Sequence, residues 1–160
     1  MSRASLTRAA AGAALALTAA CATVRADEKY PPMSEPLAQA ECSACHMAFS
    51  AAFLPARSWR AVMAGLDDHF GENAALDPAA AQQITAYLEA NAAETTRRAK
   101  FMRNLDDSQT PLRITETPYW LRKHRPGEVS PRAFLDPKVG SRANCVACHR
   151  DADRGNYDDD

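Results

Sequence analysis

The sequence lacks three features that would place it in common functional classes. Its charge is almost balanced, with 19 Lys and Arg against 20 Asp and Glu, so nothing suggests the basic face that nucleic-acid binding requires. No segment has a convincing strand pattern, which disfavours a thioredoxin-like fold. The apolar run at residues 9–24 is too short and too weakly apolar for a membrane span, which needs about 20 residues.

That apolar run has the layout of a secretory signal peptide. Arg3 and Arg8 form a basic start, and Val24-Arg25-Ala26 offers small residues at the cleavage position. Residues 1–26 are therefore predicted to be removed on export to the periplasm, a retained anchor helix being the alternative. Lipid attachment at Cys21 is not expected, because a threonine stands three positions before it. Without the three arginines of this segment, the chain has 16 basic and 20 acidic residues, a net charge of −4.

The four remaining cysteines all lie in two C-x-x-C-H motifs, Cys42 to His46 and Cys145 to His149. This motif is the attachment signature of c-type haem. Two thiols one helical turn apart can reach both vinyl groups on one edge of the porphyrin, and the adjacent histidine can then bind the iron. The sequence therefore predicts two covalently bound haem c groups, attached through Cys42, Cys45, Cys145 and Cys148.

Three other uses of these cysteines are weaker interpretations. In a zinc site built from both pairs, the halves would lie 103 residues apart, from Cys42 to Cys145, whereas structural zinc pairs are usually closer. A thioredoxin-like redox pair needs a βαβ surround. Two disulfides, which are common in exported proteins, would leave the histidine after each motif unexplained.

The four histidines match the four axial positions of two haem irons. His46 and His149 are the proximal ligands by their motifs. His69 lies 23 residues after His46, and His124 lies 25 residues before His149. Each half therefore supplies its own candidate pair, with His69 and His124 as the expected distal ligands. Either could instead be a surface histidine, and crossed pairing stays open.

Methionine is the competing distal ligand, because it raises the potential of many small cytochromes from that position. Met47 abuts His46 and cannot easily reach the opposite face of the haem. Met63 falls within an expected helix, where it is core filling, and Met102 falls in an expected linker. None has the position of His69, in a loop between two helices.

Capping residues and apolar stripes predict an all-α fold. The expected helices are one capped by Ser34 that runs into the first motif, one spanning Ala56 to Leu66, one capped by Asp77 that continues to about Asn91, and a short one capped by Thr117. The order of helix, haem motif, helix, ligand loop and closing helix resembles the class I cytochrome c fold. In that fold the loop before the closing helix supplies the distal ligand. Histidine there, in place of methionine, implies a lower potential.

The expected organisation has four parts, in which a small, irregular haem domain follows a class I cytochrome c-like one. These parts are a signal peptide at 1–26, the first haem domain at 27–93, a linker at 94–110, and the second haem domain at 111–160. A unit of about 50 residues is near the size at which metals or cross-links are needed for stability. The second haem is therefore expected to supply the core that this unit lacks.

Several longer runs resemble the soluble dihaem cytochrome c family. The runs are Glu41 to Met47, Leu54 to Trp59, Gly65 to Ala74, Thr117 to Trp120 with His124, and Cys145 to His149. The resemblance covers residues 31 to 150 approximately, and the run around His69 is the most specific. It implies bis-histidine ligation of both irons. It also implies electron transfer to a small oxygen-binding monohaem cytochrome, with a membrane b-type cytochrome as donor.

The predicted function is outer-sphere electron transfer by a periplasmic carrier that is not an enzyme. Two imidazole ligands allow iron to change oxidation state without opening a coordination position. The alternative is a gas-binding protein, a redox enzyme or a sensor, in which one haem is five-coordinate or has a labile ligand. His124 is the less certain ligand, since it lies in a short segment rich in charge.

Overall fold

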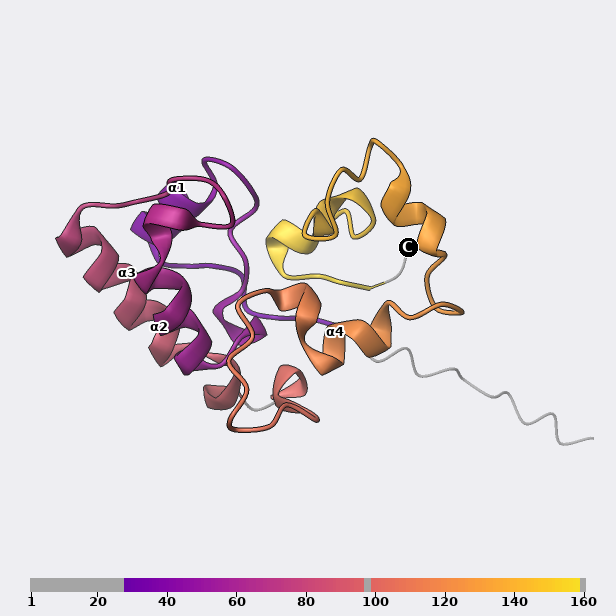
Figure 1. The fold of residues 1–160 in the computed structure, drawn as a ribbon, viewed down its shortest axis with the longest axis horizontal. Coiled ribbons are helices and arrows are strands. Elements are labelled where there is room, and N and C mark those ends of the chain that lie inside the picture. Colours follow the sequence, from indigo (N-terminus) through magenta and orange to yellow (C-terminus); the bar gives the residue numbers. More distant parts are fainter. Residues whose placement is uncertain (1–27, 97–98, 159–160) are drawn as a thin grey trace, which may run out of the picture.

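The computed structural model describes residues 28–96 and 99–158 (Figure 1). Within these ranges the chain forms four α-helices and a series of short 3-10 turns. The described residues contain no strand, only two isolated β-bridges, Lys29 with Asn156 and His69 with Glu72. The expected all-α class is therefore confirmed. The predicted signal peptide at 1–26, with Cys21, lies outside the described residues.

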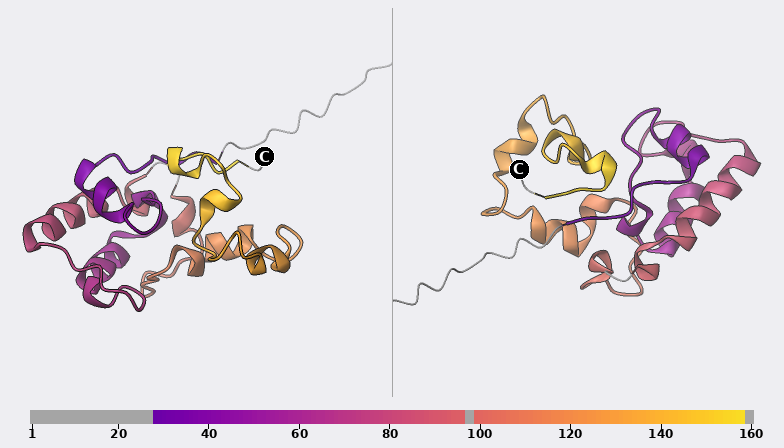
Figure 2. Two further views of the ribbon diagram at one scale, coloured as in Figure 1. Left: turned by 90° about the horizontal axis from the view of Figure 1, so that it is seen from above. Right: turned by 180° about the vertical axis from the view of Figure 1, so that it is seen from behind.

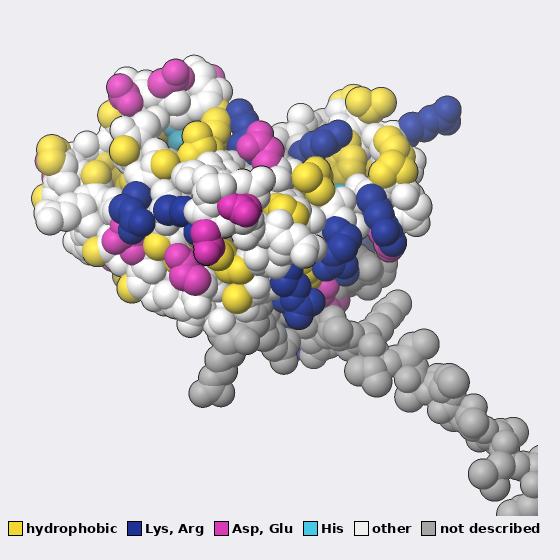
Figure 3. All heavy atoms as spheres, turned by 60° about the horizontal axis from the view of Figure 1, so that its bottom comes forward, with side chains coloured by type: hydrophobic (Ala, Val, Ile, Leu, Met, Phe, Trp, Pro, Cys, Tyr) yellow, Lys and Arg dark blue, Asp and Glu magenta, His cyan; other side chains and the backbone are white. Residues whose placement is uncertain are grey.

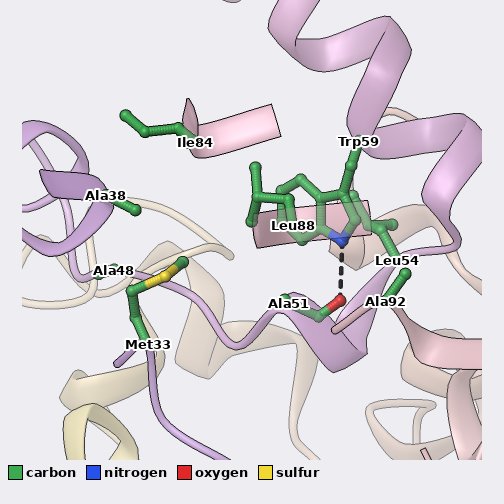
Figure 4. Close-up of a cluster of buried hydrophobic side chains, with 9 residues drawn as sticks. All are labelled: Met33, Ala38, Ala48, Ala51, Leu54, Trp59, Ile84, Leu88 and Ala92. Atoms are coloured by element: carbon green, nitrogen blue, oxygen red, sulfur yellow. Dashed lines mark hydrogen bonds between the residues drawn. The ribbon is translucent and has the colours of Figure 1, made fainter. Parts of the chain in front are cut away.

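Three helices build the N-terminal half: α1 (Pro36–Cys42), α2 (Ala56–Ala64) and α3 (Pro78–Ala90). Helices α2 and α3 lie side by side, with α1 near one end of the pair (Figure 1). Their apolar faces enclose the cluster drawn in Figure 4, to which Leu54, Trp59, Ile84 and Leu88 contribute the large side chains. Trp59 also donates a hydrogen bond from Nε1 to the carbonyl of Ala51 at 2.7 Å, so the indole is both packed and satisfied.

The start of α1 differs from the prediction by one residue. Glu35, rather than Ser34, is the N-cap, and its carboxylate accepts a hydrogen bond from the backbone N–H of Ala38. Ser34 instead contacts the Tyr87 hydroxyl on α3, with its backbone N–H donating at 3.1 Å. Ser34 therefore forms a long-range contact with α3 and does not cap α1.

The other helix boundaries follow the local signals closely. Asp77 caps α3 by accepting from the backbone N–H of Ala79, and the helix ends one residue before Asn91. Thr117 caps α4 (Pro118–Lys123) by accepting from the N–H of Trp120. Helix α2 ends at Ala64, two residues earlier than predicted, because a 3-10 turn at Leu66–Asp68 replaces its last turn.

The C-terminal half has one short α-helix and little interior of its own. After α4 the chain makes 3-10 turns at Pro131–Leu135, Cys145–Ala147 and Ala152–Arg154. From Leu121 to Arg150 every residue is exposed or only partly buried. A segment of this length without a buried residue cannot hold a fixed fold by apolar packing alone.

A second apolar cluster joins the two halves. Tyr30 and Phe53 meet Phe101, which in turn contacts Tyr119 at a ring-centroid distance of 4.9 Å. Phe101 and Leu105 belong to the predicted linker at 94–110, and both are buried. This segment therefore packs against its neighbours. The domain limits proposed from the sequence stay a prediction.

The two ends of the described chain also lie side by side (Figure 2). The N–H of Tyr30 donates to the carbonyl of Gly155 at 2.8 Å, and the N–H of Tyr157 donates to the carbonyl of Glu28 at 3.0 Å. Gly155 has φ of +83°, and a Cβ there would clash with the Tyr30 carbonyl oxygen. Only glycine fits this position, since any side chain would separate the two segments.

Glu28 reinforces this junction through its carboxylate. Tyr119 donates to Oε1 at 3.0 Å, and the Nζ atoms of Lys123 and Lys100 lie 2.9 and 3.8 Å away. Burial alone would raise the pKa of Glu28, but the contacts with Lys123, Tyr119 and Lys100 together hold the pKa below its usual 4.5. The ionised carboxylate therefore stabilises the folded state.

Glu28→Gln is expected to lower the free energy of unfolding of the haem-loaded protein by about 1–2 kcal/mol at neutral pH. Because the folded-state pKa is lowered, this contribution is present above pH 4.5 and is lost as pH falls through the folded-state pKa. Urea unfolding monitored by circular dichroism between pH 3 and 7 measures the difference. Glu128→Gln, which breaks an exposed pair with Arg125, is the control. An equal loss for Glu28→Gln at pH 3 and pH 7 would contradict the assignment.

Candidate functional site

The first motif follows directly from the end of α1. Cys42 is the last residue of that helix, and Cys45 and His46 are exposed in the turn beyond it. Burial, and to a lesser extent the charge of Glu41, raises the pKa of the Cys42 thiol. The Nδ1 atom of His46 lies 2.7 Å from the carbonyl of Met47. Because a carbonyl only accepts, Nδ1 carries the proton and Nε2 has a free lone pair.

A tight loop between α2 and α3 presents His69. The N–H of His69 donates to the carbonyl of Glu72 at 2.7 Å, and Asp68 accepts from the N–H of Gly71 at 3.1 Å. Phe70 and Gly71 both have positive φ, at 59° and 101°, which reverses the chain. Burial, then the nearby His46 and Arg113, lowers the pKa of His69. The neutral imidazole, which is the metal-binding form, is thereby favoured.

These two segments bring His46 and His69 together. Their ring centroids lie 6.2 Å apart, and the ring planes are inclined by 27°. The sequence prediction left the pairing of the halves open. The structure places His69 beside the histidine of its own half.

The second motif lies in the 3-10 turn Cys145–Ala147 near the C-terminus. Burial raises the pKa of the Cys145 thiol to about 11, whereas Cys148 is exposed. The Nδ1 atom of His149 is buried and has no hydrogen-bond partner among the described residues. An unsatisfied buried ring nitrogen is costly in an apolar setting.

His124 is the C-cap residue directly after α4 and is held by that helix. Its ring stacks on Trp120, with centroids 4.1 Å apart and planes inclined by 12°. Its Nδ1 atom lies 3.0 Å from the Trp120 carbonyl, so Nδ1 donates, which assigns metal binding to Nε2. His124 and His149 have ring centroids 6.2 Å apart and nearly perpendicular planes, at 88°.

The donor set fits haem iron at both places. Two imidazoles that bind one metal from opposite sides have centroids about 6 Å apart, since each metal–nitrogen bond is about 2 Å and each nitrogen lies about 1 Å from its ring centre. Both observed pairs meet this separation. All four described cysteines are free thiols, as thioether attachment requires.

The competing uses of these residues find less support in the structure. The described cysteines form no disulfide, and no group of three or more His, Cys, Asp or Glu side chains among the described residues could hold a metal ion by itself. Of the methionines, Met33 is buried in the first apolar cluster, Met63 packs against it, and Met102 packs against the second cluster.

Comparison with known families identifies the chain. The family model for dihaem cytochrome c matches residues 38–157, a range that includes both motifs and both histidine pairs. The chain belongs to the dihaem cytochrome c family. Membership implies two covalently bound haem c groups and an electron-transfer haem protein.

Solved structures of this family resemble the chain over most of its length. A dihaem cytochrome c from Rhodobacter sphaeroides is 51% identical with a TM-score of 0.74, and the match covers 79% of this chain and 99% of that one. A crystal structure of DHC from the same organism has 52% identity, the same coverage and a TM-score of 0.65. The dihaem cytochrome from Shewanella baltica OS155 is 39% identical with a TM-score of 0.62, over 77% of this chain and 86% of that one. No curated protein matches the chain.

Sequence reasoning missed several neighbours of the ligands, among them Trp120 and Arg113. The stacking of Trp120 on His124 has a local signal, because residues four apart share one face of a helix. Arg113 has no such local signal: its guanidinium carbon lies 3.8 Å from the ring centroid of Phe70, the residue after His69.

Within the described ranges, no helix is long and apolar enough to cross a membrane.

Proposed function

We propose that this dihaem cytochrome c is a periplasmic electron carrier in which His46 and His69 ligate one haem iron and His124 and His149 ligate the other. The observation that carries this proposal is the ring-centroid distance of 6.2 Å within both pairs. A haem iron with both axial positions filled exchanges electrons without binding substrate. The protein's part is to hold the four rings, shield the haems and set their potentials.

The contacts of the rings support permanent ligation over a labile position. The ring of His124, the less certain ligand from sequence, hydrogen-bonds to the Trp120 carbonyl and stacks on the Trp120 ring. His69 sits in a loop closed by two backbone hydrogen bonds to Glu72. Contacts of this kind to the ring of a metal ligand fix the orientation and the tautomer of that ligand. Both histidine pairs already have the centroid separation that ligation of one iron requires.

The proposed partners are other redox proteins. The family resemblance favours a membrane b-type cytochrome as the electron donor and a small oxygen-binding monohaem cytochrome as the acceptor. The predicted signal peptide at residues 1–26 supports export to the periplasm. A reduction assay with membranes that contain the b-type cytochrome, compared before and after its removal, tests the donor directly.

Electron paramagnetic resonance of the ferric protein tests the ligation, because the two pairs differ in orientation. Imidazole planes near parallel, as for His46 and His69 at 27°, separate the energies of the two iron d orbitals that interact with them. Near-perpendicular planes, as for His124 and His149 at 88°, leave these orbitals nearly equal in energy. We therefore expect two low-spin signals of equal weight, one rhombic with three resolved g values and one with a single feature at much lower field.

Carbon monoxide provides the control for a labile ligand. The visible spectrum of the reduced protein is expected to stay unchanged when carbon monoxide is added, since both axial positions are filled. A carbon monoxide shift in half of the haem, with a high-spin ferric signal of matching weight, would show one open position. That result would favour the gas-binding or enzymatic alternative.

A further inference from the structure

Charge is distributed unevenly between the two halves of the protein. Residues 28–96 carry nine Asp and Glu against three Lys and Arg, whereas residues 111–150 carry three Asp and Glu against eight Lys and Arg. The tail that follows, residues 151–160, is acidic again, with five Asp against one Arg. On the face drawn in Figure 3, most of the dark blue side chains lie over the right-hand lobe, which is the C-terminal half. Yellow apolar side chains are interspersed with them. A small overall charge therefore conceals an acidic end, residues 28–96, and a basic end, the segment at residues 111–150.

The basic end contains an open hollow beside α4. Its volume is about 560 Å³, and its lining includes Arg113, Leu121 and Arg142. Leu121 is 49% exposed, so it presents an apolar side chain to the hollow. Glu116 also lines the hollow and pairs with Arg113 at 3.7 Å.

The hollow adjoins both candidate haem sites. Leu121 lies on α4, three residues before the C-cap His124, and Ala143, another lining residue, lies two residues before Cys145. Arg113 stacks on Phe70, which follows His69. A protein bound at this hollow would therefore sit next to the ligands of both irons, and electron transfer between proteins depends on such short separations.

Two arginines, Arg142 in the lining of the hollow and Arg122 next to Leu121 on α4, have positive charge to offer a partner. Arg142 lies over the ring of Phe134 at 5.3 Å, and Arg122, next to Leu121, lies over the ring of Tyr119 at 5.0 Å. Neither forms an ion pair with a carboxylate in the described part of the chain. Ring stacking holds the two guanidinium groups in place without neutralising them.

We propose that Arg113, Leu121, Arg122 and Arg142 form a docking surface for a one-electron redox protein whose own docking surface is acidic. The exposed leucine supplies the apolar contact at the centre, and the arginines steer the partner and set its orientation. One electron crosses the interface and no bond forms or breaks. This inference rests on the proposed electron-transfer function and adds to it the chemistry of the partner and the end of the molecule that the partner uses.

Reduction by a protein of known acidic surface tests the proposal. Flavodoxin hydroquinone is the probe: its flavin anion gives one electron to ferric iron and becomes the neutral semiquinone. Stopped-flow absorbance records the rate for the haem-loaded wild type, Arg142→Glu, Arg122→Glu and the control Arg60→Glu. Arg60 is an exposed arginine on α2, in the acidic half, paired with Glu89, so its replacement changes the charge by the same amount at the other end.

Arg142→Glu and Arg122→Glu are each expected to slow the reaction about tenfold at low ionic strength, and Arg60→Glu by less than about twofold. Added salt should slow the wild type and remove these differences, because it screens exposed charges. An equal effect of Arg60→Glu, or no effect of either variant on the basic end, overturns the proposal. The proposal is also overturned if these two variants keep the wild-type rate with flavodoxin but lose binding to phosphatidylglycerol vesicles. That result would indicate that the surface binds a membrane instead.

Two further measurements separate the docking surface from the carrier function. Reduction by a photogenerated neutral deazaflavin radical does not depend on charge. If the wild type accepts electrons from it and the charge variants behave alike, the haems work and only docking is in question. If the wild type fails with both reductants, the proposed function fails. Unchanged visible and paramagnetic resonance spectra in Arg142→Glu show that its haems are intact, and Arg142→Gln repeats the test with a smaller change.

Discussion

Replacing His69 with alanine is expected to convert one of the two haems from low-spin to high-spin and to leave the other unchanged. His69 faces His46 at 6.2 Å across the first site, while His124 and His149 form a separate pair at the same distance. Removal of one ring therefore opens one axial position only. The reduced variant should bind carbon monoxide at half of its haem.

The resonance spectrum shows which haem has changed. In His69→Ala the rhombic signal should disappear, because it belongs to the near-parallel pair, while the low-field signal of the perpendicular pair should remain. His124→Ala is the matched variant and should have the opposite effect. Loss of both signals in either variant, or no change in either, would refute the pairing.

A methionine at the same position offers a finer test. His69→Met keeps a ligand in place but replaces a strong donor by a weaker one. The potential of the first haem should then rise by on the order of 0.1 V or more, within the range of about 0.8 V that axial ligation controls. Spectroelectrochemistry of the two haems measures the shift, and the second haem should change little.

Replacing both Cys145 and Cys148 with serine is expected to unfold the C-terminal segment at residues 121–150. No residue from Leu121 to Arg150 is fully buried, so this segment has no interior without the haem that the second motif attaches. In the double variant, produced with one haem as verified by mass, residues 121–150 should lose their protection against amide exchange almost completely. The N-terminal half, with its own apolar cluster, should keep its protection and its haem.

Val146→Ser is the matched control, since it changes the same turn but keeps both thioether bonds. Its exchange pattern and its two-haem mass should equal those of the wild type. Limited proteolysis gives an independent reading: cleavage in the double variant is expected first between Lys123 and Arg150. Persistent protection of this segment in the one-haem protein would show that the polypeptide holds the fold alone.

The short-range features could be predicted from sequence because their causes lie within a few residues. The cap at Asp77 with Pro78, the cap at Thr117 with Pro118 and the spacing of each C-x-x-C-H motif depend on neighbours one turn away. Ser34 shows the limit of such reasoning. Its position and residue type both suit a cap, but the Tyr87 hydroxyl, which lies on another helix, takes its hydrogen bonds.

Other features depend on packing between segments far apart in the chain. Phe101, in the predicted linker, is buried because Phe53 and Tyr119 meet it from opposite halves. Gly155 is constrained by the carbonyl of Tyr30, and Arg113 contacts the loop of His69. No local sequence pattern predicts these contacts, because each one forms only after the rest of the fold has placed both partners.

The sequence by itself determined the cofactor chemistry, the number of histidines available and the helical class, because motif spacing and capping act over single turns. The tertiary structure decided which histidines face each other, at what angle, and how the charged ends are arranged. Those properties depend on the relative placement of segments more than twenty residues apart, and that placement results from two apolar clusters and the Glu28 junction rather than from any local signal.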